Sequence, residues 1–262
     1  MKSNKFNTYV INLNKDKYKY SKIKKDLFKI GINPIRFDAI YGKKIKNKFD
    51  KYLTQFSKLF TPFSIIGCGL SHTILAEQLY KYDTNFYSLV LEDDAVPLFK
   101  NSLEIEKVVE EAPKDWDIIL LYCQGICNYK NNSYKLGVIP GGAVAYLINK
   151  KGQEKSKNIK LISHIDIQRY GTSNLNIYKS PKPLFTTDES TPSSTSNEKY
   201  SFLKIFDYLL GNVLECDLSA NCASKYLAYK ILRIPGTNIE LDFLHLICLI
   251  VIIIILYRYG VL

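Results

Sequence analysis

The chain has 262 residues, of which 47% are hydrophobic, and its formal net charge is +11. This apolar content excludes a wholly disordered chain, and the length allows one large α/β domain or a domain with an appendage. The charge favours anionic partners such as nucleotide phosphates, acidic glycans, nucleic acid or an anionic membrane face. A solvated lysine-rich surface, typical of an AT-rich genome, is the alternative.

The apolar pattern alternates between strands and helices up to about residue 185. Strands are predicted at residues 8–13, 34–37, 86–91, 116–122 and 142–148. Helices are predicted at residues 17–30, 67–82, 101–112 and 150–159. Since strand, helix and strand in succession build a parallel sheet, we expect residues 1–185 to form an α/β sandwich.

The sequence changes character after this domain. Residues 186–199 are polar and contain proline, which predicts a loop or linker, and residues 200–240 are expected to be a helical extension. Residues 241–262 read LDFLHLICLIVIIIILYRYGVL and approach the roughly 20 residues that a spanning helix needs. We therefore expect a C-terminal membrane anchor with the preceding domain on the cytosolic side. A buried core strand or helix is the alternative.

The cysteines also bear on location. They show neither a paired CxxC motif nor zinc-ligand spacing, and are Cys68, Cys123, Cys127, Cys216, Cys222 and Cys248. We expect reduced thiols, with a bridge between Cys123 and Cys127 as the alternative. The N-terminal stretch MKSNKFNTYVINL has an apolar run too short for a signal peptide. The expected compartment is therefore cytosolic and reducing.

Three consecutive carboxylates follow a buried strand in the stretch SLVLEDDAVP, residues 88–97. Adjacent like charges repel one another unless a positive charge lies among them. Because side chains alternate along an extended segment, Glu92 and Asp94 are expected on one side and Asp93 on the other. Two carboxylates on one side suit a hard divalent ion, Mn²⁺ or Mg²⁺, which in turn neutralises a diphosphate. An acidic surface turn is the alternative.

Several blocks of sequence occur together with this acidic motif. They are VINL at 10–13, RFDAIYG at 36–42, GCGLSH at 67–72, LVLEDDAVP at 89–97, DWDIILLY at 115–122 and GAVAYLINKKGQEK at 142–155. In this order they resemble glycosyltransferase family 25, over about residues 7–170. The resemblance implies a GT-A type, Rossmann-like nucleotide-sugar-binding fold. It also implies transfer of a hexose, often galactose, from a UDP-sugar to a hydroxyl acceptor with inversion.

The resemblance assigns the acidic motif to metal and donor binding. Glu92, Asp93 and Asp94 form its DxD-like element, with Asp94 as the first metal ligand. Glu92 is the second candidate ligand, and Glu92 or Asp93 is shared with the donor sugar or ribose. The ion is Mn²⁺ or Mg²⁺. Beyond residue 170 a third ligand does not align clearly, with Asp188 and Glu189 as possible positions.

Four further residues are assigned to the donor in the same way. Asn12, at the end of the first strand, and Asp38, after the second, are expected near the uridine and ribose. Ser71 and His72 match the family's Ser-His pair and are expected to face the donor. For His72 the alternative is a histidine buried in a helix whose ring is hydrogen-bonded to a backbone carbonyl.

An inverting transfer needs a base that takes the proton of the acceptor. Asp166 is the candidate base and His164 a possible helper, because HID at 164–166 lies where the family has an acidic residue. For Asp166 the alternative is an N-cap. Where relatives have an arginine soon after the first strand, this chain has lysines, so point charges from Lys15 or Lys17 replace a bidentate clamp.

The sequence thus predicts a metal-dependent, membrane-associated glycosyltransferase. Its acceptor is a hydroxyl on a glycan, lipid-linked glycan or protein, and its donor sugar is galactose or glucose. A catalytically degenerate, membrane-bound binding protein and a Mg²⁺-dependent phosphotransferase or nuclease are the alternatives. GCGLSH lacks the third glycine of a dinucleotide fingerprint, and no nucleic-acid module accompanies the basic helix, so nucleic acid is not an expected partner.

Overall fold

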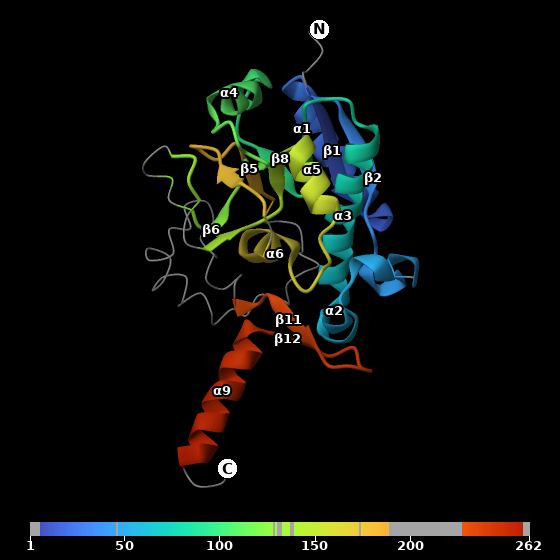
Figure 1. The fold of residues 1–262 in the computed structure, drawn as a ribbon, viewed down its shortest axis with the longest axis vertical. Coiled ribbons are helices and arrows are strands. Elements are labelled where there is room, and N and C mark those ends of the chain that lie inside the picture. The colour runs from blue at the N-terminus through green and yellow to red at the C-terminus, as the bar shows by residue number, and fades with distance from the viewer. Residues whose placement is uncertain are drawn as a thin grey trace.

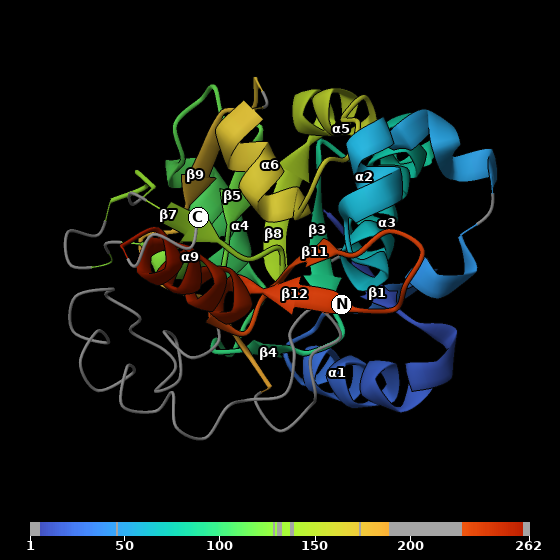
Figure 2. The ribbon, with the colours of Figure 1, turned by 90° about the horizontal axis from the view of Figure 1, so that it is seen from below.

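The computed structural model describes residues 6–45, 47–127, 129, 133–136, 139–172, 174–188 and 227–258. Within this part of the chain, a central mixed sheet carries helices on both faces (Figure 1). Figure 2 shows α1 on one face of the sheet and α3, α5 and α6 on the other. The layered α/β architecture predicted from the sequence is therefore confirmed for the described residues.

Six strands form the central sheet. In sheet order they are β2 (Pro34–Asp38), β1 (Asn7–Asn12), β3 (Tyr87–Glu92), β8 (Ala145–Asn149), β5 (Ile118–Leu120) and β9 (Ile177–Lys179). β1 pairs in parallel with both β2 and β3, as predicted. β8 runs antiparallel to β3 and β5, so the expectation of an all-parallel sheet is wrong at this strand.

Four helices of the described residues follow the predicted positions with small shifts: α1 (Lys17–Lys29), α3 (Phe63–Tyr82), α4 (Leu103–Glu111) and α5 (Lys150–Lys157). α9 (Phe243–Arg258) lies within the predicted anchor, whereas α2 (Gln55–Phe60) and α6 (Ile165–Thr172) were not predicted. α3 begins earlier than predicted, directly after Pro62, whose fixed φ and missing N–H suit a helix start. The Asn149 side chain caps α5 by accepting a hydrogen bond from the Gly152 N–H.

Two apolar cores cover the two faces of the sheet. Val10 and Leu89 belong to the core under α1 and α4, whereas Ile11 and Val90 belong to the core under α3. This division follows from the alternation of side chains along each strand. The central strands are apolar on both faces because helices bury both of them.

Two glycines bring α3 against the loop that follows β2. A Cβ atom on Gly67 would lie 2.6 Å from the carbonyl oxygen of Ile40, and one on Gly42 would overlap the carbonyl of Phe63. The same contact is fixed by Ser71, whose hydroxyl accepts a hydrogen bond of 2.8 Å from the Ile40 N–H. The blocks RFDAIYG and GCGLSH are thus packed together, backbone against backbone.

In the described part of the chain, three short two-stranded ribbons lie outside the central sheet. They are β4 (Ala95–Pro97) with β10 (Phe185–Thr187), β6 (Gln124–Ile126) with β7 (Ile139–Gly141), and β11 (Lys230–Arg233) with β12 (Glu240–Asp242). β10 pairs with β4 antiparallel, and Thr187 lies opposite Ala95. β10, at the start of the predicted polar loop, therefore lies beside the segment that follows the acidic motif, although it comes about ninety positions later in the chain. Residues 189–199 of that loop lie outside the described residues.

The C-terminal predictions need correction. Residues 200–226 of the expected helical extension lie outside the described residues, and Lys230–Arg233 is a strand rather than a helix. α9 projects from the body of the molecule (Figure 1). It has 16 residues, which corresponds to about 24 Å, whereas a hydrocarbon core is about 30 Å thick. Among the described residues no helix is both long and apolar enough to cross a membrane, so the predicted transmembrane helix is not supported.

Cys123 and Cys127 form a disulfide in the structure. The expectation of reduced thiols is therefore wrong for this pair, and the alternative considered from the sequence is the one observed. Cys68 and Cys248 are free thiols. The cytosolic location, which was inferred in part from reduced cysteines, stays a prediction.

Candidate functional site

The carboxyl ends of β1, β2 and β3 meet at one edge of the sheet. Asn12, Asp38 and Glu92 are the last residues of these three strands, and Asn12 lies opposite Asp38 in the register. The chain leaves β1 to form β2 on one side and β3 on the other, so the strand order reverses at β1. Ligands of open α/β sheets bind at such a reversal, beyond the carboxyl ends of the strands.

A chain of polar contacts crosses this edge from β3 to β2. The Asn12 amide donates a hydrogen bond of 2.6 Å to the Asp93 carboxylate. Arg36 Nε donates to the Asn12 side-chain oxygen at 2.8 Å, and Arg36 also forms an ion pair of 2.5 Å with Asp38. We call Asn12, Arg36, Asp38 and Asp93 the cross-strand chain. It places three of the predicted donor-binding residues side by side and fixes their orientation.

Glu92 faces a different set of side chains. His72 is buried, and its Nδ1 lies 2.9 Å from the Tyr146 hydroxyl while its Nε2 lies 3.1 Å from a Glu92 carboxylate oxygen. Arg169 lies over the Tyr146 ring, 4.9 Å from its centre. Together with Cys68, whose Sγ is 3.9 Å from Glu92, these residues form what we call the inner cluster.

Burial sets the protonation of the inner cluster. Burial and the nearby Arg169 charge lower the pKa of His72 to about 3, so its ring is neutral at neutral pH. Burial, Asp93 and Asp166 raise the pKa of Glu92. His72 is thus a buried histidine with both ring nitrogens hydrogen-bonded, although to side chains rather than to a backbone carbonyl. The predicted contact of His72 with the donor stays a prediction.

Asp94 is the carboxylate of the motif that the protein leaves available. Among the described residues its Oδ1 is buried and has no hydrogen-bond partner. Burial and the charges of Glu92 and Asp93 raise the pKa of Asp94. An unpaired buried carboxylate oxygen costs free energy, on the order of a few kcal/mol, unless a ligand satisfies it. Asp94 Oδ1 is therefore suited to accept a cation or a hydrogen-bond donor.

The donor atoms at the motif fit a hard divalent ion. Glu92, Asp93 and Asp94 offer carboxylate oxygens, which are the ligands that Mg²⁺ and Mn²⁺ prefer. A softer set lies beside it, because ligand atoms of Cys68, His72 and Glu92 all lie within 4.8 Å of one another. Sulfur and imidazole nitrogen suit zinc better than magnesium. The two sets share Glu92.

The segment after β10 completes the surroundings of Asp94. The Asp188 N–H donates a hydrogen bond of 2.8 Å to the Asp94 carbonyl oxygen. The Asp188 carboxylate forms an ion pair with Lys22 of α1. Of the two possible third ligands considered from the sequence, Asp188 is therefore beside the motif, and Glu189 lies outside the described residues.

The remaining predicted residues are placed as follows. Ser71 is buried and contacts the backbone of Gly67 and Ile40, so its described contacts are between α3 and the loop after β2. Asp166 lies in the first turn of α6 and accepts hydrogen bonds from the Gly142 and Ile167 N–H groups.

His164 contacts the C-terminal segment. Its Nε2 is 2.9 Å from the Lys230 carbonyl oxygen, and its ring contacts Tyr229. Asp166 is near enough to raise the pKa of Glu92, whereas the described contacts of His164 are with another element. Asp166 is thus close enough to the motif to act on Glu92 electrostatically, and the helper role of His164 stays a prediction.

Sequence reasoning missed three charged or polar side chains of the site. Relatives have an arginine soon after the first strand. In this chain the arginine at this edge of the sheet is Arg36, which lies on β2. Its position inside the block RFDAIYG was the available signal. Tyr146 and Arg169 reach Glu92 through His72, and no local pattern marks either of them because the contact depends on how β8 and α6 pack.

Residues 5–160 match the profile described as "Glycosyltransferase family 25 (LPS biosynthesis protein)". The protein is thus a glycosyltransferase. Because the match spans more than half of its 262 residues, the chain belongs to glycosyltransferase family 25. The mixed α/β sheet fits the GT-A-like fold expected from the sequence. A search of curated proteins found no match.

Solved structures with distant similarity include three glycosyltransferases. One is involved in glycosylation of the major capsid of PBCV-1, with 10% identity over 64% of this chain and 74% of the other, and a TM-score of 0.39. Mouse xyloside xylosyltransferase 1 has 13% identity over 63% and 67%, with a TM-score of 0.36. A Drosophila β-1,4-galactosyltransferase 7 mutant, solved with manganese, UDP-Gal and xylobiose, has 7% identity over 69% of both chains and a TM-score of 0.33.

Proposed function

We propose that this glycosyltransferase transfers a hexose, galactose or glucose, from a UDP-sugar to a hydroxyl acceptor, and that the reaction depends on Mn²⁺ or Mg²⁺. The acceptor is a hydroxyl on a glycan, a lipid-linked glycan or a protein. The observation that carries the proposal is the buried, unpartnered Oδ1 of Asp94 at the edge where the first three strands end. Family membership supports the transfer reaction, and the carboxylate oxygens support the hard cation.

In this proposal the three consecutive carboxylates have different tasks. Asp94 and Glu92 hold the ion, and Asp93 binds the donor sugar or ribose while Asn12 keeps its carboxylate oriented. When bound, the divalent ion supplies Lewis-acid stabilisation of the departing diphosphate. Asn12 and Asp38 contact the uridine and ribose, and Arg36 holds both of them in place.

Asp166 is the proposed base for the acceptor hydroxyl. Its two hydrogen bonds from backbone N–H groups fix the carboxylate in one orientation at the start of α6. A positioned carboxylate within reach of the acceptor speeds proton removal by about 10²–10⁴-fold. The bonds also match the capping role considered from the sequence, and one residue can serve both purposes.

The test is turnover of UDP-galactose and UDP-glucose by the purified chain with Mn²⁺, compared with Asp94→Asn. We expect turnover to fall by about 10²–10³-fold in this variant, because the ion that stabilises the diphosphate is lost. Asp26→Asn is the matched control, since Asp26 lies on the exposed face of α1 and pairs with Lys29. That variant should retain full activity.

Two results would overturn the proposal. The first is wild-type protein that neither binds UDP in a metal-dependent way nor turns over any UDP-hexose, which would favour a degenerate transferase that only binds its partners. The second is an Asp94→Asn variant as active as the Asp26→Asn control.

A further inference from the structure

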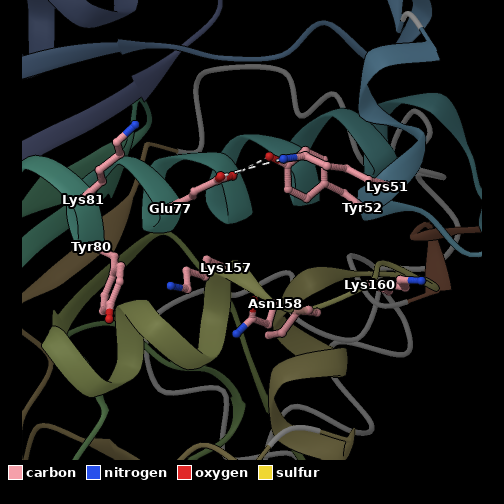
Figure 3. A pocket seen from close by; sticks show the side chains of 9 residues that line it. Lys51, Tyr52, Glu77, Tyr80, Lys81, Lys157, Asn158 and Lys160 are labelled. Carbon is pink, nitrogen blue, oxygen red and sulfur yellow. Dashed lines mark hydrogen bonds and ion pairs between the residues drawn. The ribbon is translucent and has the colours of Figure 1, made fainter.

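A groove lies between α3 and α5 (Figure 3). Its volume is about 480 Å³, within the range of small-molecule sites. It is lined by Lys51, Tyr52, Glu77, Tyr80, Lys81, Lys157, Asn158, Ile159 and Lys160. None of Glu92, Asp93 and Asp94 lines the groove, and Glu77, the lining residue of α3 that is nearest in sequence to His72, is five positions after it, which corresponds to about 7.5 Å of helix. The groove and the acidic motif are therefore separate sites.

The groove carries an excess of positive charge. Four lysines and a single glutamate line it. Glu77 is already engaged, because it accepts a hydrogen bond from the Tyr52 hydroxyl and lies 3.8 Å from Lys51. In the described part of the chain, Lys157 and Lys160 form no ion pair with a carboxylate. These ammonium groups are available to an anion, and lysine is a common ligand for phosphate.

Aromatic and neutral polar groups stand among the lysines. The Lys157 ammonium lies 3.6 Å from the centre of the Tyr80 ring, and that of Lys51 lies 4.5 Å from the centre of the Tyr52 ring. Figure 3 shows the Lys157 side chain pointing toward Tyr80, with Asn158 beside it. Tyrosine rings pack against the apolar face of a small ring, and the Asn158 amide can bond to hydroxyl groups.

We infer that this groove binds an anionic sugar, a single hexose unit that carries a phosphate or a carboxylate. Its ammonium groups bind the anion, and its tyrosine rings and Asn158 bind the sugar ring. The volume fits one sugar unit with its substituent, and a simple anion would not use the two tyrosines. The inference concerns binding and does not depend on the proposed transfer reaction.

The test is binding of glucose 6-phosphate to the full chain, measured by calorimetry beside glucose and inorganic phosphate. We expect glucose 6-phosphate to bind more tightly than either. The double variant Lys157→Gln/Lys160→Gln should weaken it by at least about tenfold, because two charge-assisted contacts are lost. Lys25→Gln/Lys107→Gln, which removes the same charge outside the groove, is the control and should bind like wild type.

Two more variants separate the parts of the inference. Asn158→Ala should weaken glucose 6-phosphate but not inorganic phosphate, because only the sugar hydroxyl groups contact the amide. Asp94→Asn should bind glucose 6-phosphate as wild type does, whether or not it has lost transfer activity. Three results would each overturn the inference. The first is an equal loss of glucose 6-phosphate affinity in the groove double variant and the lysine control. The others are equal affinity for glucose 6-phosphate and inorganic phosphate, and loss of glucose 6-phosphate binding in Asp94→Asn.

Discussion

Asp93 and Glu92 are neighbours in the chain, yet they belong to two different regions of the site. Asp93 joins the cross-strand chain, where polar and charged groups from β1 and β2 contact one another at the edge of the sheet. Glu92 joins the inner cluster, where a neutral histidine, a tyrosine and a cysteine surround it under α3. Among the described residues, Asp94 Oδ1 has no hydrogen-bond partner from either region.

The different surroundings of Asp93, Glu92 and Asp94 explain how three adjacent carboxyl groups are accommodated. Burial raises the pKa of all three carboxyl groups; the hydrogen bond from Asn12 opposes this rise at Asp93, whereas neighbouring carboxylates add to it at Glu92 and Asp94. The contact with Asn12 thus favours the ionised form of Asp93, and Glu92 and Asp94 favour the protonated form until a cation arrives. The following predictions test this division, from the largest expected effect to the smallest.

The largest effect is expected at the border of the inner cluster, in Asp166→Asn. The amide oxygen can still accept the hydrogen bond from the Gly142 N–H, so the start of α6 should keep its structure. Without a proton acceptor, turnover should fall by about 10²–10⁴-fold, while metal-dependent UDP affinity stays unchanged. Steady-state kinetics and calorimetry measure the two quantities. Unchanged turnover would show that Asp166 is a helix cap alone.

A smaller effect is expected in His72→Gln. The variant leaves Tyr146 or Glu92 without its buried partner, which should lower the free energy of unfolding by about 1–3 kcal/mol. Urea denaturation measures this loss. UDP affinity should be retained, because the structure places the His72 ring between buried side chains. Lost UDP affinity with full stability would instead support the donor contact predicted from the sequence.

The smallest effect is a pH dependence of the stabilisation by metal. A carboxyl group whose folded pKa is raised destabilises the metal-free protein at high pH, and this penalty disappears as the pH falls through the raised pKa. Because Glu92 and Asp94 have raised pKa values, protons compete with Mn²⁺ for them below neutral pH. Mn²⁺ should therefore raise the Tm more at pH 8 than at pH 6. Equal shifts at the two pH values, or the same dependence in Asp94→Asn, would contradict this.

Much of the fold follows from local pattern. Alternating and helical periodicities located β1, α1, β2, α3 and β3 and placed the ends of three strands at one edge, where Asn12, Asp38 and Glu92 indeed lie. Such periodicities arise because one or both faces of an element are buried, and the positions of apolar residues in the sequence show which faces these are. The direction of β8 could not be read in this way, because a strand buried on both faces looks the same in either orientation.

The details of the site depended on contacts between distant segments. The pairing of β10 with β4 brings Asp188 beside Asp94, and the packing of α6 brings Arg169 over Tyr146. Neither contact leaves a periodic trace in the sequence. The spanning helix was predicted from hydropathy alone. Hydropathy does not show that Leu241 and Asp242 belong to β12, so that the helix begins only at Phe243.

The most direct test of the central claim is the anomalous scattering of Mn²⁺ in crystals of the protein grown with UDP. The account predicts a manganese peak at coordination distance from Asp94 Oδ1, with UDP at the carboxyl ends of β1 and β3, and no such peak in Asp94→Asn. UDP bound at this edge without manganese at Asp94, or manganese held only by Cys68 and His72, would contradict it.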